Sequence, residues 1–347
     1  MIGREGEAYF YGANSERGFV ITPDRKAGER EGSRCVIIKG GPGSGKSTMM
    51  KRFSREAQIA GWQVTDYYCS SDPDSFDAVT AEKGDDRLFV CDGTAPHIAD
   101  PVYPGACSEI LDLTSEWNRE ALAERARDIA ELTEKKKACF GRAYSYEAAS
   151  HEVYTEARRL TSGVIDRPKL DSFTERALGK LKLKKGEPRF AFTEAVSMKG
   201  AVSLDTLARS ADEIYFIDDE LGASCEVMDA FRRRLDLLRA EYVACLCPYE
   251  TGTLDSVFIP SVGRLYTVIE TDGAKSLNSA RFLQKGASGI RGRLRLCSKC
   301  RKALLEAALS SLEEAKSHHF ALEDIYIRSL DFRSLDRVCE KRLLSLL

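Results

Sequence analysis

The stretch that decides the fold is RCVIIKGGPGSGKST, from Arg34 to Thr48. Its second half matches the pattern GxxxxGK[ST], which requires a strand before the turn and a helix after it. The run over 34–40 is short, apolar and ends in glycine, as expected of a buried parallel strand. After it, apolar residues recur at helical spacing, which predicts a helix over 45–60.

A turn of this kind between a strand and a helix is typical of a phosphate-binding P-loop, so we expect the chain to bind ATP with Mg²⁺. Glycines let successive backbone N–H groups point at the phosphates, and the helix N-terminus adds the positive end of its dipole. Lys46 would neutralise the β- and γ-phosphates, and the Ser47 hydroxyl would be a ligand of Mg²⁺. The residues expected to hold the nucleotide are Gly40, Gly41, Pro42, Gly43, Ser44, Gly45, Lys46, Ser47 and Thr48.

The Mg²⁺ also needs a carboxylate, which usually ends a neighbouring apolar strand. The run LFVCD over 88–92 has this pattern, and Asp92 is its last residue. We therefore predict Asp92 as the second Mg²⁺ ligand; the alternative is a strand-end aspartate that caps the following turn. Position 93 is glycine rather than the acidic residue that often follows, so a catalytic base has to come from another segment.

Two candidates for that base, His97 and Asp77, follow predicted strand ends at the edge of the sheet where phosphates bind. The alternative for His97 is a hydrogen-bonded structural histidine near a turn. The predicted catalytic residues are Lys46, Asp92, His97 and Asp77, with Asp72, Asp74 and Glu109 as further candidates.

Which nucleotide the site prefers, ATP or GTP, is inferred from a missing motif. GTPases usually carry an Asn-Lys-x-Asp segment that reads guanine. The nearest string in this chain, over 168–171, begins with proline and falls in the linker-like stretch 163–188. ATP is therefore preferred to GTP.

The composition excludes several classes of protein. The chain has 347 residues, enough for two domains, and 52 basic against 54 acidic residues give a net charge of −2. This balance gives no signal for nucleic acid or anionic lipid. No window approaches the roughly 18 consecutive apolar residues of a membrane helix. The N-terminal residues lack the pattern of a secretory signal, so we expect a cytoplasmic protein.

The eleven cysteines are expected to be reduced, mostly buried thiols. Two pairs, Cys245 with Cys247 and Cys297 with Cys300, could instead supply four thiolates to zinc. Their spacing is not that of a standard zinc knuckle, and no histidine lies nearby in the sequence.

The two halves of the sequence can be aligned with each other, which indicates an internal repeat. Five identities share an offset of 182, beginning with Phe10 and Phe192 (192 − 10). The next matches share an offset of 178, beginning with Met50 and Met228 (228 − 50). Near the ends of the halves the offset is 180, as for Phe140 and Phe320 (320 − 140).

We therefore predict an α/β fold in which a P-loop NTPase-like parallel sheet with flanking helices is duplicated in tandem. The predicted parts are a P-loop domain over 1–170, a linker over 171–182 and a degenerate repeat over 183–347. Each copy should consist of a strand, a helix, a strand, a short helical segment, a strand and then a long helical hairpin.

The second copy lacks the residues that bind phosphate. At the offset of 178, the P-loop falls on DDELGASC over 218–225, where Ser224 replaces the lysine. Asp218, Asp219 and Glu220 stand where phosphates would bind, so charge repulsion should exclude a triphosphate. This copy could still complete the first site, and an arginine finger in cis is one hypothesis, against the alternative of a solvated basic loop. The candidates for the finger are Arg281, Arg291, Arg293 and Arg295.

Four segments carry a resemblance to a known family: FYGANSERGF, IIKGGPGSGKST, YYCSSDPDSFDAV and VCDGTAPHIADPVYPGA. In this order they resemble a family of bacterial P-loop ATPases built of two tandem nucleotide-binding units. The resemblance covers essentially the whole chain, and CSSD and DGTAPH are its more specific parts. It implies ATP binding at Gly40 to Thr48 and an intracellular role, without naming a substrate. In similar sequences the second unit can carry its own P-loop, and this chain departs from them there.

We expect a Mg²⁺-dependent ATPase whose hydrolysis drives a conformational change, which a protein or small-molecule partner would read. One alternative is a small-molecule or nucleotide kinase, in which the helical hairpin would close over an acceptor. Another is a non-catalytic ATP sensor, which the glycine after Asp92 favours.

Overall fold

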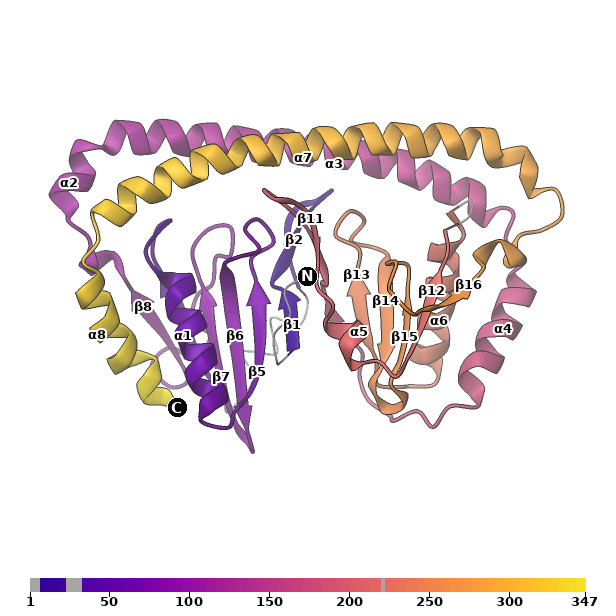
Figure 1. Cartoon of the computed structure of the whole chain (residues 1–347), viewed down its shortest axis with the longest axis horizontal. Coiled ribbons are helices and arrows are strands. Elements are labelled where there is room, and N and C mark those ends of the chain that lie inside the picture. Colours follow the sequence, from indigo (N-terminus) through magenta and orange to yellow (C-terminus); the bar gives the residue numbers. More distant parts are fainter. Residues whose placement is uncertain (1–6, 23–32, 220–221) are drawn as a thin grey trace.

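The computed structural model describes residues 7–22, 33–219 and 222–347. Two six-stranded sheets lie side by side, and two long helices run across one edge of both (Figure 1). Each sheet is mixed, with mostly parallel strands and flanking helices, so the predicted α/β class is confirmed. None of the described helices combines the length and the apolarity that a membrane span needs.

The first sheet contains β4, the strand that precedes the predicted P-loop. This strand pairs in parallel with β7 on one side and with β8 on the other, whereas β6 runs opposite to both of its neighbours. Helix α1 (Lys46–Ile59) packs on this sheet through the buried Met50 and Phe53. The strand order is β1 (Glu7–Phe10), β5 (Gln63–Tyr68), β6 (Phe76–Lys83), β7 (Asp86–Asp92), β4 (Ser33–Lys39) and β8 (Ser108–Asp112).

The second sheet has the same strand order and the same directions. Its reversed strand is β14, and helix α6 (Ser224–Leu237) occupies the position that α1 has in the first unit. In the matching order, the strands are β9 (Arg189–Ala191), β13 (Val243–Leu246), β14 (Leu254–Ile259), β15 (Arg264–Thr267), β12 (Glu213–Ile217) and β16 (Lys275–Leu277).

Two of the offsets found in the sequence are reproduced by the element bounds. Helices α1 and α6 differ by 178 at both ends (224 − 46 and 237 − 59). Two β-hairpins differ by 182, as their first residues show (194 − 12). These hairpins are β2 (Gly12–Ser15) with β3 (Gly18–Ile21), and β10 (Glu194–Ser197) with β11 (Gly200–Ser203).

The hairpins and the first strands of the two sheets join the halves at the centre of the molecule. The Phe10 amide donates a hydrogen bond to the Phe192 carbonyl at 2.8 Å. The Asn14 side chain donates to the Val196 carbonyl, also at 2.8 Å. The short helix α5 (Thr206–Ser210) adds a further contact, since the Thr206 hydroxyl donates to the carbonyl of Ala8 in β1. The halves are therefore joined through β1, β2, β10 and α5.

The three strands predicted in the first half are present as β4, β5 and β7. The expected short helical segment between β5 and β7 is wrong, because these residues form β6, which pairs with both strands. All of residues 76–81 are buried. A strand in the middle of a sheet that is covered on both faces loses the alternation by which strands are recognised.

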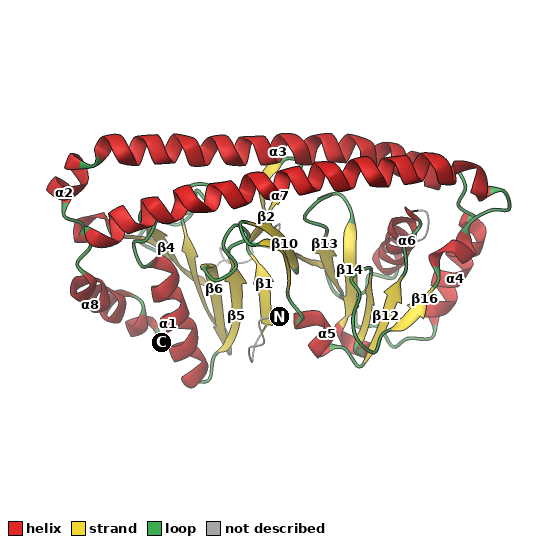
Figure 2. Ribbon diagram, turned by 45° about the horizontal axis from the view of Figure 1, so that its top comes forward, coloured by secondary structure: helices red, strands yellow, loops and turns green. Residues whose placement is uncertain are grey.

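Each half contributes one long helix, and the predicted hairpin within each copy is wrong. Helix α3 (Ala126–Ser162), preceded by the short α2 (Arg119–Glu124), runs from the first sheet to the second. Helix α7 (Arg291–Arg328) runs back beside it (Figures 1 and 2). Their bounds differ by 165 and 166 (291 − 126 and 328 − 162), so the predicted offset of 180 does not hold here.

Each long helix ends in a shorter helix that packs on the unit of the other half. Helix α4 (Arg167–Gly179) follows α3 and buries Leu170 in the core of the second unit. Helix α8 (Phe332–Arg342) follows α7 and buries Leu335 in the core of the first unit, beside α1. The segment 171–182, predicted as a linker, is therefore helical over most of its length. The first core includes residues from the end of the chain.

We expect Leu335→Ala to lower the free energy of unfolding by about 2–5 kcal/mol, since it removes a buried side chain from the first core. Leu335 is 5% exposed. The matched control is Leu237→Ala, a helical leucine that is 77% exposed and should cost far less. Urea unfolding of both variants would measure the difference. Equal stability of the two would contradict the assignment of α8 to the first core.

Candidate functional site

The glycine-rich turn that the sequence predicts to be a P-loop joins β4 to α1, so it lies between a strand and a helix as its pattern predicts. Gly43 and Gly45 have positive φ values of 67° and 81°, which side chains other than glycine rarely adopt. Gly45 is the N-cap of α1, so the amides of the first helical turn point toward the loop. The chain therefore has the backbone conformation that an anion site at a helix N-terminus requires.

The Lys46 side chain lies within this loop. Its Nζ donates hydrogen bonds to the carbonyls of Gly40 and Gly41, both at 2.8 Å. The same Nζ is 3.5 Å from Oδ2 of Asp92. The ammonium group is thus held between the glycine-rich turn and the end of β7.

Asp92 ends β7, next to the P-loop strand, and is buried. Its Oδ1 accepts a hydrogen bond from the Thr94 amide at 2.7 Å, and the Thr94 hydroxyl donates to the Gly40 carbonyl at 2.8 Å. Burial raises the pKa of the Asp92 carboxyl, and the nearby Lys46 ammonium opposes this rise. The Asp92 carboxylate caps the turn at Thr94, as the alternative predicted, and it lies beside Lys46. The role of Asp92 as a Mg²⁺ ligand stays a prediction.

Ser47 lies at the start of α1, where its Oγ accepts a hydrogen bond from the Phe76 amide at 2.9 Å. A serine hydroxyl and an aspartate carboxylate are hard oxygen ligands, which is the donor type that Mg²⁺ prefers. Ser47 and Asp92 therefore fit the magnesium site that the sequence predicts. The remaining ligands would come from phosphate oxygens and water.

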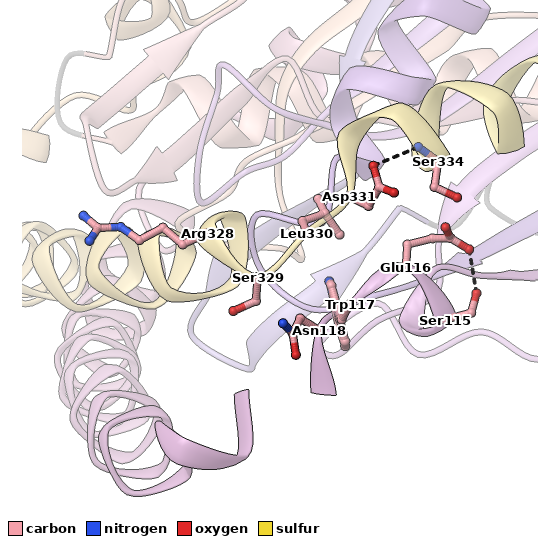
Figure 3. A pocket seen from close by; sticks show the side chains of 9 residues that line it. All are labelled: Ser115, Glu116, Trp117, Asn118, Arg328, Ser329, Leu330, Asp331 and Ser334. Carbon is pink, nitrogen blue, oxygen red and sulfur yellow. Dashed lines mark hydrogen bonds between the residues drawn. The ribbon is translucent and has the colours of Figure 1, made fainter. Parts of the chain in front are cut away.

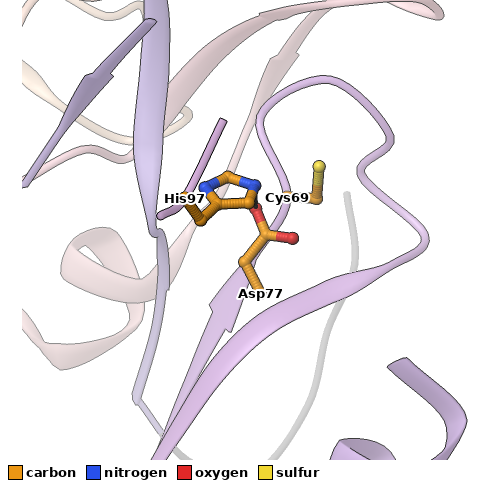
Figure 4. Close-up of side chains that lie close together, drawn as sticks. All are labelled: Cys69, Asp77 and His97. Atoms are coloured by element: carbon orange, nitrogen blue, oxygen red, sulfur yellow. Dashed lines mark ion pairs between the residues drawn. The ribbon is translucent and has the colours of Figure 1, made fainter. Parts of the chain in front are cut away.

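The structure brings together His97 and Asp77, which the sequence offered as separate candidates. Nε2 of His97 is 3.1 Å from Oδ2 of Asp77, and both residues are buried. Cys69 lies beside the pair, and the three side chains point toward one another (Figure 4). Burial raises the pKa of the Cys69 thiol well above its usual value, which keeps the thiol neutral.

This pair adjoins the carboxylate at the end of β7. The charges of Asp77 and His97 both act on the Asp92 carboxyl, in opposite directions. The His97 ring also contacts the rings of Tyr11 and Phe19, with centroids 5.6 and 4.7 Å away. Aromatic contacts and the close approach of Asp77 therefore fix the orientation of the imidazole beside the loop.

Three other acidic candidates have different partners. The carboxylates of Asp72 and Asp74 pair with Nζ of Lys199, from the turn of the β10–β11 hairpin. Glu109 lies in β8 and pairs with Arg342 of α8 at 2.9 Å. These interactions join the two halves of the chain, so we assign these three residues a structural role.

No sequence pattern identifies the residues of α7, or the tryptophan after β8, that cover the predicted P-loop. A Cβ atom placed on Gly43 would lie 2.9 Å from the Ile327 side chain and 3.0 Å from the Glu323 carbonyl. A Cβ on Gly41 would lie 3.1 Å from the ring of Trp117 and 3.3 Å from that of Tyr326. These contacts join segments far apart in the sequence, and no spacing rule predicts them.

Lys136 of α3 is a second basic residue near the loop. It shares a helical stripe with the buried Cys139 and Ala143, so it faces inward. Burial lowers the pKa of Lys136, and the nearby Lys46 ammonium lowers it further. The Glu323 carboxylate has the opposite effect and raises this pKa. A lysine within a stripe of buried side chains is the signal that could have identified it.

The proposed arginine fingers lie far from the P-loop. Arg291 and Ile327 are 36 residues apart in α7 (327 − 291), and Ile327 contacts the P-loop. A helix rises 1.5 Å per residue, so Arg291 is about 54 Å away along the helix axis. Arg293 and Arg295 occupy the next turns, and Arg281 packs on Phe173 in the second unit. The hypothesis of a finger from these residues is wrong for this arrangement.

The second loop uses its own carboxylates where a P-loop holds phosphate. Oδ1 of Asp219 accepts hydrogen bonds from the Ser224 amide, at 3.2 Å, and from the Ser224 hydroxyl. Oδ1 of Asp218 accepts from the Ser279 amide at 2.7 Å. The N-terminus of α6 is thus capped from within the chain. Glu220, the third predicted carboxylate, lies outside the described residues.

The four cysteines considered for zinc do not gather. Cys245 lies in β13, whereas Cys297 and Cys300 lie in the first part of α7. Within the described ranges, three or more metal-binding side chains come close together at Cys69, Asp77 and His97, and at Cys139, Glu314 and His318. Neither group includes the predicted thiols.

Comparison of the chain with protein-family models, curated proteins and solved structures gave no match. The resemblance to tandem P-loop ATPases therefore stays a prediction.

Proposed function

We propose that this protein is a Mg²⁺-dependent ATPase with a P-loop NTPase-like first unit and a degenerate second unit. The observation that carries the proposal is the grouping of Lys46, Asp92 and the His97–Asp77 pair around a glycine-rich turn. Ligands of α/β sheets bind at the carboxyl ends of the strands, and β4 and β7 both end at this group.

Each residue has a role that follows from its position. Lys46 would exchange its carbonyl partners for the β- and γ-phosphates, and Ser47 and Asp92 would hold the Mg²⁺. The metal would neutralise charge that develops on the transferred phosphoryl group. His97, oriented by Asp77, would accept a proton from the attacking water. Lys136 would add a positive charge from the side of α3.

The proposed conformational change has a direct structural route. The P-loop contacts α7 at Glu323 and Ile327, and α7 extends over the second unit. A nucleotide that changes the conformation of the loop on binding would therefore also move α7, a helix that both units share. A protein or small-molecule partner could read this shift, as in other switches in which an ordered element is displaced.

Titration with a non-hydrolysable ATP analogue and Mg²⁺ is expected to saturate at one nucleotide per chain. The second loop should bind none, because Asp219 already accepts the hydrogen bonds of the α6 N-terminus. Calorimetry would give the stoichiometry. Ser224→Ala should leave it unchanged, and two nucleotides per chain would contradict the degenerate role of the second unit.

Phosphate release tests the proposal against its two alternatives. Release from Mg²⁺–ATP in water, without any acceptor, is expected for the ATPase. Transfer that occurs only when an acceptor is added would indicate a kinase. Tight binding with negligible turnover under either condition would indicate an ATP sensor.

A further inference from the structure

A cavity of about 550 Å³, largely open to solvent, lies on the surface where the two halves meet beside the predicted P-loop (Figure 3). Residues 115–118, which follow β8, form one wall, and residues 328–331 with Ser334, where α7 joins α8, form the other. Two backbone hydrogen bonds connect the walls. The Asn118 amide donates to the Ser329 carbonyl at 2.7 Å, and the Asp331 amide donates to the Glu116 carbonyl at 3.1 Å.

The position of this cavity relative to the phosphates is set by the strand order. Strand β4 lies between β7 and β8. Asp92, at the end of β7, is the proposed Mg²⁺ ligand, so the γ-phosphate belongs on the β7 side of the loop. The rest of a bound nucleotide would then extend to the β8 side. The chain that leaves β8 forms the wall of the cavity that contains Trp117.

The lining has the chemistry that a nucleoside requires. The rings of Trp117 and Tyr326 lie 5.2 Å apart, at the edge of the P-loop. Nε1 of Trp117 is buried and has no hydrogen-bond partner among the described residues. Glu116 and Asp331 contribute carboxylates, which accept hydrogen bonds from hydroxyl groups. An aromatic face, a buried donor and two acceptors suit a base and a ribose.

We propose that this cavity binds the nucleoside part of the triphosphate held by the P-loop, with Trp117 contacting the base and the carboxylates contacting the ribose. The inference rests on the proposed function. A volume of about 550 Å³ lies within the range of small-molecule sites. Because both halves form the walls, a nucleotide bound there contacts the α7–α8 junction directly.

The test compares ATP with tripolyphosphate, which has the phosphates but no nucleoside, in the presence of Mg²⁺. Trp117→Ala should weaken ATP binding about 5- to 150-fold, the range for loss of a stacked base, and leave tripolyphosphate binding unchanged. Trp62→Ala, at the other of the chain's two tryptophans, is the matched control and should change neither affinity. Trp117→Phe keeps a ring and should lose less than the alanine variant.

Fluorescence gives a second readout without altering the cavity. Trp62→Phe leaves Trp117 as the sole tryptophan. ATP should then change its emission, and tripolyphosphate should change it much less. This measurement also covers the case in which Trp117→Ala fails to fold.

The outcomes separate this inference from the proposed function. If Trp117→Ala binds ATP as tightly as the unaltered chain, while Lys46→Ala loses both ligands, the cavity assignment is overturned and the P-loop function stands. Equal weakening of ATP and tripolyphosphate would show that Trp117 supports only the shape of the loop at Gly41, which also overturns the assignment. If the unaltered chain binds neither ligand, the proposed function itself fails.

Discussion

Lys46→Ala should weaken binding of Mg²⁺–ATP by at least about 100-fold, because charge-assisted hydrogen bonds to two phosphates are each worth about 1.5–3 kcal/mol. The Lys46 ammonium lies within the loop, on the carbonyls of Gly40 and Gly41 and beside Asp92. No other residue described in the P-loop can replace its charge. Calorimetric titration with a non-hydrolysable analogue would measure the loss.

The fold should survive this change, since Lys46 contributes no apolar contact to the first core. Lys83→Ala is the matched control. Lys83 ends β6, and its ammonium donates to the Ala60 carbonyl on the surface. Unaltered ATP affinity in a folded Lys46→Ala variant would contradict the P-loop assignment. A similar loss in Lys83→Ala would indicate a general effect of charge rather than a site.

The parts of the fold that follow from the sequence are those determined by neighbouring residues. The strand over 33–39, the turn and the helix over 46–59 agree with the prediction, because the hydrophobic period changes there and the glycines end the strand. Strand β6 was missed because its first six residues are buried on both faces. Local pattern cannot distinguish such a run from a buried helical segment.

The exchange of α4 and α8 between the units could not be predicted from the sequence. A leucine at helical spacing, such as Leu335, indicates an amphipathic helix but does not identify the surface that it covers. The structure places Leu335 in the first core, about 300 residues away in sequence from the P-loop strand. A truncation after the first half would therefore remove part of the first core along with the second unit.

The residues of the candidate site also fall into two groups, those that a local sequence pattern predicts and those that only the packing of distant segments brings together. Lys46, Ser47 and Asp92 were predictable because a motif and a strand end identify them. His97 and Asp77 were predicted only separately, since they come from different elements and their contact depends on the packing of β6 against β7. Trp117, which follows β8, and Tyr326 of α7 approach the loop through packing between distant segments, which no local pattern indicates. Lys136 of α3 is indicated only by its place in a stripe of buried side chains.

Asp92→Asn is expected to lower Mg²⁺-dependent turnover by about 100-fold or more, the size of effect seen when one group that stabilises transition-state charge is removed. A neutral amide is a poor ligand for a hard cation. The amide oxygen can still accept the hydrogen bond that Oδ1 of Asp92 receives from the Thr94 amide, so the turn should persist. Binding of ATP through Lys46 should be largely retained.

The measurement is phosphate release as a function of Mg²⁺ concentration, beside analogue binding in the same variant. Asp86→Asn is the matched control, because Asp86 is an exposed aspartate at the opposite end of the same strand. It should leave both quantities unchanged. Full turnover in Asp92→Asn would assign the metal to another carboxylate, and Asp77 would be the first to test, since its charge already acts on Asp92. A loss of binding that matches the loss of turnover would instead indicate that Asp92 acts by positioning Lys46, whose ammonium lies 3.5 Å away.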